Sequence, residues 1–467
     1  MATITTVLGG ALGDGQYGRV HTAVLVEDGV AREVAVKTFK VKLADGKKHK
    51  NTIGRRREVT HLTALPRHPR VLHADVVYTD AHGCLCIATP LARTSLWHEV
   101  GRRSVRADDV LRWSADVIAG VAHLHRHRVM HRDLKLDNVF VDRGGGAVVA
   151  DLGVARFVGA VGSADFSSTV CVAPLRPPEC FLARLRDADC EWMAYGPELD
   201  SWALGFTLLA LASGNYLLKT DEGADAREAL AAILAVCGRP PALDFEGEFP
   251  PYELAARADR LRALARRDDL PRPFWLTAAA LLDVAPSRRA SVVALADTPF
   301  WSRLVSAEPL EPEAAAAARG ALGRPVALDA SNVLAWGDRR AAVAARAFED
   351  MRAALGGALA CSVTASAALY ATARGRLKCS AAVVAAACTL VASLKAQMQR
   401  VQPIVPNARA SNLVALAALH VASMLFGGTT PHAKAWRAVL PRTIKKRAYD
   451  DLVDATFRAA DLSMLYN

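Results

Sequence analysis

The fold of this chain is decided by one stretch of sequence, His131-Arg132-Asp133-Leu134-Lys135-Leu136-Asp137-Asn138. An amphipathic run over residues 110–126 precedes it, and the apolar run Val139-Phe140-Val141 follows it. This context predicts a helix, then a loop, then a strand. A loop can bring the carboxylate of Asp133, the ammonium group of Lys135 and the amide of Asn138 to one reacting group. Taken alone, the octapeptide could also be a charged surface turn.

Composition and charge narrow the classes of function. The 467 residues suffice for two or three domains with sizeable cores. The 58 Lys and Arg exceed the 47 Asp and Glu, which gives a formal net charge of +11. The basic residues are scattered and aromatic residues are scarce, so we do not expect nucleic-acid binding. The nine cysteines lack zinc-type spacing, which favours a reduced, intracellular location, either cytoplasmic or nuclear.

Two features argue against a membrane protein. Residues 1–10 lack a basic region followed by an apolar run, so we expect no signal peptide. The longest uncharged stretch, residues 379–394, is shorter than the roughly 18 residues that a spanning helix needs. We therefore expect a soluble protein with no membrane partner.

A glycine-rich segment, Gly13-Asp14-Gly15-Gln16-Tyr17-Gly18, lies between two β-branched runs. The pattern G-x-G-x-x-G is shared with dinucleotide-binding folds, in which a helix follows it. Here a strand that includes Val20 follows, which predicts a β-hairpin. Glycines in this hairpin would let the backbone approach phosphate groups without Cβ clashes. The next strand, residues 33–37, ends in Lys37, which could bind phosphate or lie on the surface of an edge strand.

A helix is predicted over residues 54–65, because Pro66 and Pro69 follow it. Glu58 on this helix is our candidate for a carboxylate that pairs with Lys37 and keeps it charged. The alternative is a solvent-facing glutamate beside Arg55-Arg56-Arg57.

These motifs, in this order over residues 8–303, resemble the protein kinase superfamily. The resemblance implies an α+β, bilobal kinase fold in residues 1–303, with a small β-rich N-lobe at about 1–90 and a helical C-lobe at about 93–303. It implies ATP and Mg²⁺ as cofactors and a protein substrate. Lys135, after Asp133, implies a Ser or Thr acceptor rather than Tyr.

The resemblance also assigns roles to single residues. Asp133 would accept the proton of the substrate hydroxyl, Lys135 would steady the transferring group, and Asn138 with Asp151 would bind the metal. Lys37, oriented by Glu58, would position the phosphates. The implied ATP-binding residues are Gly13, Gly15, Gly18, Val20, Ala35, Lys37, Pro90 and Ala92.

Within the superfamily, the chain resembles the cyclin-dependent kinase branch. Residues 57–60, Arg-Glu-Val-Thr, resemble the Arg-Glu-Ile-Ser of that family's cyclin-binding helix. The resemblance implies regulatory phosphorylation at Tyr17 and at Ser167, although Ser167 could equally lie in an ordinary polar loop. The arginines implied to surround a phosphorylated Ser167 are Arg57, Arg132 and Arg156.

The sequence departs from the family pattern at two informative positions. Leu152 replaces the usual Phe after Asp151, which keeps an apolar anchor. Val172 replaces a threonine that in the family bonds the catalytic aspartate and lysine, which puts the catalytic rate and the substrate preference in doubt.

The C-terminal third differs from the rest of the chain in composition. Residues 304–328 are rich in Pro, Ala, Glu and Gly and predict a linker. Residues 329–467 predict an all-α domain, with helices near 338–357, 363–374, 378–398, 408–425 and 445–464. Residues 376–395 weakly resemble the central helix of a cyclin box. The alternative is a generic helical domain that binds a partner.

The sequence therefore predicts a Ser/Thr protein kinase of the cyclin-dependent-kinase-like branch, activated in cis by a cyclin-like domain that packs on residues 52–65. A pseudokinase scaffold is one alternative, favoured by Val172 and Leu152. A kinase that recruits a separate cyclin is another.

Overall fold

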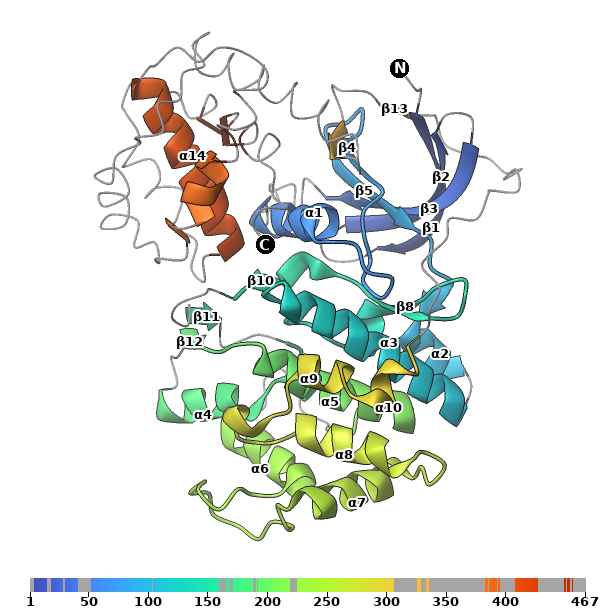
Figure 1. Cartoon of the computed structure of the whole chain (residues 1–467), viewed down its shortest axis with the longest axis vertical. Coiled ribbons are helices and arrows are strands. Elements are labelled where there is room, and N and C mark those ends of the chain that lie inside the picture. Colours follow the sequence, from blue (N-terminus) through green and yellow to red (C-terminus); the bar gives the residue numbers. More distant parts are fainter. Residues whose placement is uncertain are drawn as a thin grey trace.

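Figure 1 presents the computed structural model of the chain, in which a β-rich N-lobe lies above a helical C-lobe. The structure describes residues 4–14, 18–27, 30–40, 52–102, 104–158, 165–167, 171–187, 190, 192–218, 225–305, 326–328, 333–335, 383–384, 386–392, 394, 408–426, 449–450, 452–453 and 456. Among these residues, no helix is both long enough and apolar enough to cross a membrane.

The N-lobe is built on an antiparallel sheet. Its first five strands are β1 (Ile4–Asp14), β2 (Gly18–Glu27), β3 (Val30–Phe39), β4 (Val76–Thr79) and β5 (Leu85–Pro90), in the spatial order β1-β2-β3-β5-β4. Along β3, Val34 and Val36 are buried in the core on one face. Because side chains alternate along a strand, Ala35 and Lys37 lie on the other face. The predicted N-lobe is thus confirmed, and its sheet orients Lys37.

The C-terminal part extends this sheet at both edges, which corrects two predictions. Strand β13 (Val326–Leu328) lies in the predicted linker and pairs with β1. Strand β14 (Val333–Ala335) lies in the predicted all-α region and pairs with β4. Both are short apolar runs, and the edges of the N-lobe sheet offer them unpaired backbone groups. Leu328 of β13 and Val333 of β14 are five residues apart in the sequence, a distance of at most about 18 Å. The edge strands β1 and β4, on which they pair, therefore lie close together, and the sheet is curled.

The C-lobe is mostly helical and is centred on α5 (Glu198–Ser213). This helix is apolar on all sides and almost wholly buried, as expected for a core helix. Helix α3 (Ala107–Arg126) contains the amphipathic run of residues 110–126, so the predicted helix is confirmed. The other helices are α2 (Leu96–Arg102), α4 (Pro178–Arg186), α6 (Ala226–Cys237), α7 (Leu254–Ala265), α8 (Arg272–Leu281), α9 (Val292–Ala296) and α10 (Pro299–Ser302).

Short strands and 3-10 turns complete the C-lobe, most of them between α3 and α5 in the sequence. Strand β7 (Val129–Met130) pairs with β10 (Arg156–Phe157), and β8 (Val139–Val141) pairs with β6 (Thr94–Ser95) and β9 (Ala147–Val149). Strand β11 (Asp165–Ser167) pairs with β12 (Trp192–Ala194). The 3-10 turns are η1 (Leu136–Asn138), η2 (Leu152–Val154), η3 (Ala173–Leu175) and η4 (Pro286–Arg288). The decisive stretch, residues 131–138, follows α3 and the short strand β7, contains η1 and leads into β8. The predicted order of helix, loop and strand is confirmed, with β7 added before the loop.

Helix α14 (Ala408–Phe426) joins the C-terminal part to the N-lobe. It lies beside α1 (Thr52–Ala64), and contacts both α1 and β10 (Figure 1). Val59 of α1 and Leu419 of α14 belong to one continuous hydrophobic cluster. The helix predicted near 408–425 is confirmed, and helical residues also occur within 383–394 and 449–456. The helices predicted near 338–357 and 363–374 lie outside the described residues.

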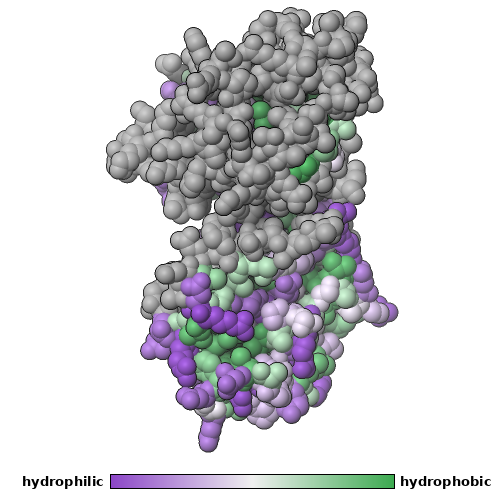
Figure 2. Space-filling model, turned by 90° about the vertical axis from the view of Figure 1, so that its left-hand side faces the viewer, coloured by the Kyte–Doolittle hydropathy of each residue, from purple (hydrophilic) through white to green (hydrophobic). Residues whose placement is uncertain are grey.

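The surface of the C-lobe mixes hydrophobic and hydrophilic areas on the side shown in Figure 2. In the described part of the chain, six large apolar side chains are exposed: Leu12, Val30, Trp97, Leu185, Leu254 and Leu264. Trp97 on α2 is the one aromatic residue among them.

Candidate active site

The predicted pair of Lys37 and Glu58 is formed between β3 and α1. Lys37 Nζ lies 2.6 Å from Glu58 Oε1 and 4.0 Å from Asp151 Oδ1. Burial raises the pKa of the Glu58 carboxyl, and the ammonium group of Lys37 opposes that rise. The lysine is thus held between two carboxylates, one buried and one 43% exposed.

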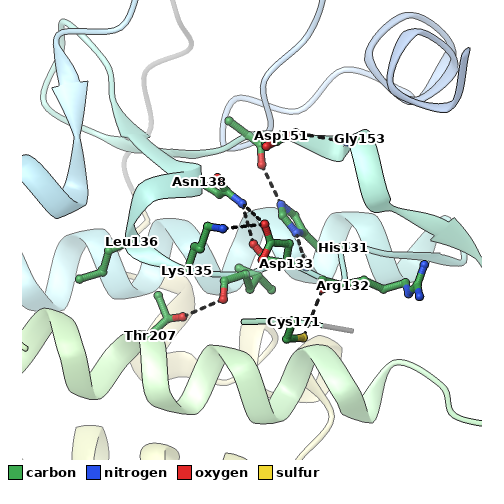
Figure 3. Close-up of polar contacts among 12 residues, drawn as sticks. His131, Arg132, Asp133, Lys135, Leu136, Asn138, Asp151, Gly153, Cys171 and Thr207 are labelled. Atoms are coloured by element: carbon green, nitrogen blue, oxygen red, sulfur yellow. Dashed lines mark hydrogen bonds and ion pairs between the residues drawn. The ribbon is translucent and has the colours of Figure 1, made fainter. Parts of the chain in front are cut away.

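Asp133 lies at the centre of a second polar group, shown in Figure 3. Lys135 Nζ donates to Asp133 Oδ2 at 2.8 Å, and Asn138 Nδ2 donates to the same oxygen at 2.9 Å. Among the described contacts, Oδ1 of Asp133 takes no hydrogen bond. Burial lowers the pKa of Lys135, but the bond to Asp133 and its charge more than offset this, so the pKa is raised overall. Asp133 therefore has one oxygen fixed and one left for another donor.

The backbone of this loop is held by Asp200 at the start of α5. Its carboxylate accepts the backbone N–H groups of His131 at 2.7 Å and Arg132 at 2.8 Å, and a bond from His125 Nε2 at 2.8 Å. Asp200 is fully buried. We did not single out Asp200 as a site residue, although a lone aspartate opening a strongly apolar helix was a visible signal.

Asp151 adopts a left-handed backbone conformation, with φ of 58°, and its side chain accepts the N–H of Gly153 at 3.3 Å. The next residue, Leu152, is fully buried, so it acts as the expected apolar anchor. Asp151 and Asn138 offer carboxylate and amide oxygens, the hard donors that Mg²⁺ prefers. Within the described residues, no group of three or more His, Cys, Asp or Glu could hold a metal. The two oxygen donors of Asp151 and Asn138 fit a Mg²⁺ that keeps water and phosphate ligands.

The glycine-rich hairpin leaves room for phosphates at one described glycine. A Cβ on Gly13 would meet no atom within 4 Å, whereas a Cβ on Gly18 would lie 2.7 Å from the carbonyl oxygen of Thr38. Gly18 is thus required by packing, and Gly13 faces open space. Gly15 and Tyr17 lie outside the described residues.

The remaining predicted ATP-binding residues lie on or next to the same sheet. Val20 is paired with Lys37 across β2 and β3, so it shares the face of Lys37 and Ala35. Pro90 ends β5 opposite Val34, and Ala92 follows the strand. Val20, Ala35 and Lys37 thus form one surface opposite the sheet's hydrophobic core.

The three predicted arginines are brought together by α1, the loop after β7, and β10. Burial and the charge of Arg132 lower the pKa of Arg57 to about 9. Burial also lowers the pKa of Arg156, and the charges of Arg57 and Arg132 lower it further. The arrangement therefore gathers positive charge that the three side chains do not neutralise among themselves.

Neutral acceptors contact two of these arginines. Arg132 donates to the hydroxyl of Tyr195 from Nε at 3.1 Å and from a terminal nitrogen at 2.8 Å. Arg156 donates to the carbonyl oxygens of Val154 and Ala155, both at 2.9 Å. The backbone of Ser167 lies in β11, and its side chain is outside the described residues.

One contact was missed by sequence reasoning. The thiol of Cys171 donates to the carbonyl oxygen of Arg132 at 3.2 Å (Figure 3). Cys171 has a positive φ of 59°, and it precedes Val172, where the family has a hydroxyl. The polar contact to the loop thus comes from the neighbouring position.

Comparisons with known proteins agree with this geometry. The family model described as "Protein kinase domain" matches residues 7–301. The human "Hormonally up-regulated neu tumor-associated kinase" is 26% identical over 204 residues, which cover 44% of this chain and 27% of that protein. The human "NUAK family SNF1-like kinase 2" is 29% identical over 206 residues, which cover 44% of this chain and 30% of that protein. The matched stretch thus spans less than a third of either relative.

The match to the family model extends over more than half of the 467 residues. A protein kinase domain uses ATP and Mg²⁺, and the donor groups at Lys37, Asn138 and Asp151 fit both. The chain belongs to the protein kinase family.

Proposed function

We propose that this chain is an active serine/threonine kinase that transfers the γ-phosphoryl group of ATP to a protein hydroxyl. The observation that carries the proposal is the contact of Lys37 with Glu58 at 2.6 Å and with Asp151 at 4.0 Å. It places the phosphate-binding cation beside a candidate metal ligand. A scaffold that did not bind Mg·ATP would not need this arrangement.

Each residue has a stated role in the proposal. Mg²⁺ bound with ATP would supply charge neutralisation at the phosphates, and Asn138 and Asp151 would hold it. Lys37 binds the phosphates and Glu58 orients Lys37. Asp133 accepts the proton of the substrate hydroxyl on its remaining oxygen. Lys135, whose pKa is raised, stays charged at neutral pH and stabilises the transferring group.

The finer proposal is that the kinase is cyclin-dependent-kinase-like and is activated in cis by its C-terminal part. Helix α14 contacts α1, which carries Glu58, and β10, which carries Arg156. Packing on α1 would hold Glu58 toward Lys37. Because α14 already covers α1, a separate activator would have to displace it, which disfavours recruitment of another cyclin.

Kinase activity on a generic Ser/Thr substrate tests the proposal in full-length protein, in residues 1–303 and in Asp133→Asn. We expect activity in the first alone. Retention of full activity in residues 1–303 would remove the cis-activation proposal. If residues 1–303 lose activity and circular dichroism shows that they are unfolded, the C-terminal part is needed for folding. Ala418→Glu in the full chain, at a buried position of α14, then separates loss of activation from loss of folding.

One observation favours the scaffold alternative. Val172 lacks the hydroxyl that the family uses near the catalytic aspartate. Tight Mg·ATP binding by the full-length protein without turnover on any peptide would support that alternative and contradict ours.

A further inference from the structure

Two side chains of the N-lobe reach one turn of the C-lobe, residues 142–146 between β8 and β9. Arg70, in the segment between α1 and β4, is buried and donates to Asp142 at 3.1 Å. Glu33 on β3 forms an ion pair with Arg143, and the two side chains are 37% and 34% exposed. The turn therefore joins the lobes through charged groups, in addition to the chain segment that follows β5.

Both partners of the exposed ion pair stand on backbone that is itself held in place. In the turn, Oδ1 of Asp142 accepts the N–H of Gly146 at 2.8 Å, and the N–H of Asp142 donates to the carbonyl oxygen of Gly146 at 2.9 Å. On β3, Arg32 precedes the glutamate and donates to Asp75 of the N-lobe at 2.7 Å. Fixed backbones lower the conformational entropy that the ion pair costs, so a partly exposed pair can still hold the lobes.

The strands that meet at this ion pair lead to the groups proposed to bind Mg·ATP. Glu33 shares a face of β3 with Ala35 and Lys37, because side chains alternate along a strand. Strand β8 begins directly after Asn138, and β9 ends two residues before Asp151. The ion pair therefore ties the strand that presents Lys37 to the two strands that lead to the candidate metal ligands. Lys37 lies four residues, or about 13 Å, from the glutamate, so the pair acts on it from a distance.

Binding of Mg·ATP requires both lobes at once, since Lys37 belongs to the N-lobe and Asn138 and Asp151 belong to the C-lobe. If the lobes moved freely, the nucleotide would have to arrest that motion, and its affinity would fall by the free energy of ordering. A contact that fixes the lobes beforehand reduces this cost. Loss of such a contact weakens the binding of Mg·ATP without removing any group that binds it.

We propose that Glu33 and Arg143 are positioning residues, which hold the two lobes in the orientation that binds Mg·ATP. They act through Lys37 and the metal ligands and do not bind the nucleotide themselves. The inference rests on the proposed kinase function and adds to it the contact that orients its two lobes. Because the pair is partly exposed, its removal changes the affinity for ATP only by about threefold.

Exchange of the two charges tests the proposal, with steady-state kinetics of the full-length protein on a Ser/Thr peptide. Glu33→Arg and Arg143→Glu each place like charges opposite one another, and each should raise the KM for ATP about fivefold. The double variant restores an ion pair of reversed polarity and should return the KM for ATP to within about twofold of its original value. The KM for the peptide should stay unchanged, because the catalytic loop lies within the C-lobe.

Arg112→Gln is the matched control. The guanidinium of Arg112 lies beside the same turn, 3.6 Å from where a Cβ on Gly145 would stand, but it pairs with Asp109 of its own helix at 3.0 Å. We expect this variant to keep the KM for ATP. The proposal is overturned if the double variant binds ATP no better than the weaker single variant, if both single variants keep the original KM for ATP, or if the KM for the peptide rises equally.

Failure of this inference can be told apart from failure of the kinase function. An active kinase whose KM for ATP ignores the charge exchange contradicts the inference alone. If no peptide is phosphorylated, a fluorescent, non-hydrolysable ATP analogue with Mg²⁺ is titrated onto the same four proteins. Weaker binding by each single variant and recovery in the double variant support the inference, and equal binding by all four overturns it.

Discussion

Arg70 and the group of Arg57, Arg132 and Arg156 place positive charge in opposite surroundings. Arg70, 1% exposed, lies between two carboxylates, with Asp142 at 3.1 Å and Asp116 at 3.7 Å. Arg57, Arg132 and Arg156 lie instead near one another, and burial together with their mutual repulsion lowers the pKa of Arg57 and Arg156.

The difference separates a charge that carboxylates neutralise from charges that lie beside one another. Removing Arg70 would leave two buried carboxylates without their cation, so the ion pairs there serve stability. Arg57, Arg132 and Arg156 gain from an added anion, because a phosphate can bind several guanidinium groups at once. Four measurements can break or sharpen this distinction.

The largest effect is expected for Arg70→Met. It should lower the free energy of unfolding by about 3–5 kcal/mol, because Asp142 and Asp116 would be left buried and unpaired. Urea denaturation of the full chain measures it. Arg126→Met is the control, since it breaks a pair with Asp297 whose side chains are 42% and 65% exposed, and should cost less than about 1 kcal/mol. Equal small losses in both variants would show that Arg70 is not a structural charge.

The second effect concerns phosphorylation at Ser167, which stays a prediction. A phosphate reaching the three arginines should stabilise the fold by about 2 kcal/mol, or roughly 4–8 °C in melting temperature. Mass spectrometry locates the phosphate, and calorimetry compares the phosphorylated and unmodified forms. Arg156→Gln should remove most of the gain, and Ser167→Ala should remove it entirely. The same gain in Arg156→Gln would mean that the phosphate binds elsewhere.

The third effect is a fall in stability with acid, caused by histidines around Arg70. The pKa values of His68, His73 and His123 are each lowered to about 4, first by burial. The unfolded chain binds protons near pH 6.5 while these folded rings do not, so stability is full above pH 6.5 and falls toward pH 4. We expect a loss of up to about 1 kcal/mol per ring at pH 5.5, after allowance for partial exposure.

Urea titrations at pH 7.5, 6.5 and 5.5 measure this slope. His68→Gln should flatten it, whereas substitution of the exposed His82 should leave it unchanged. His61, beside the other arginine group, has its pKa lowered to about 3 by burial and by Arg156 and Arg57, so part of the slope should survive His68→Gln. A slope unaffected by His68→Gln would leave the acid sensitivity to His73, His123 and His61.

The sequence was sufficient where structure is set by local pattern. The amphipathic period located α3, and motif order located Lys37, Glu58, Asp133, Lys135 and Asn138. It was insufficient where pairing joins distant segments. Strands β13 and β14 are three residues each and acquire their structure from the edges of a sheet some 250 to 320 residues earlier, which no local period can reveal.

The same limit explains why Cys171 was missed. Its role depends on a positive φ of 59°, which turns a thiol toward the loop where the family would use the next residue. Since that backbone turn is not encoded by residue type, only the absence of a hydroxyl at Val172 was visible in the sequence.

The smallest effect is expected at Cys171, whose thiol bonds the carbonyl oxygen of Arg132 and so touches the arginine group from the backbone side. Burial raises the pKa of this thiol, so it stays protonated and can donate. Cys171→Ala should lower kcat about two- to tenfold, the kinetic equivalent of one neutral hydrogen bond. Cys171→Ser should retain most of the activity, because a hydroxyl can donate to the same oxygen. Equal losses of activity in Cys171→Ala and Cys171→Ser would assign the effect to packing. If adding Val172→Thr to Cys171→Ala restores activity, the loop needs one donor, which either position can supply.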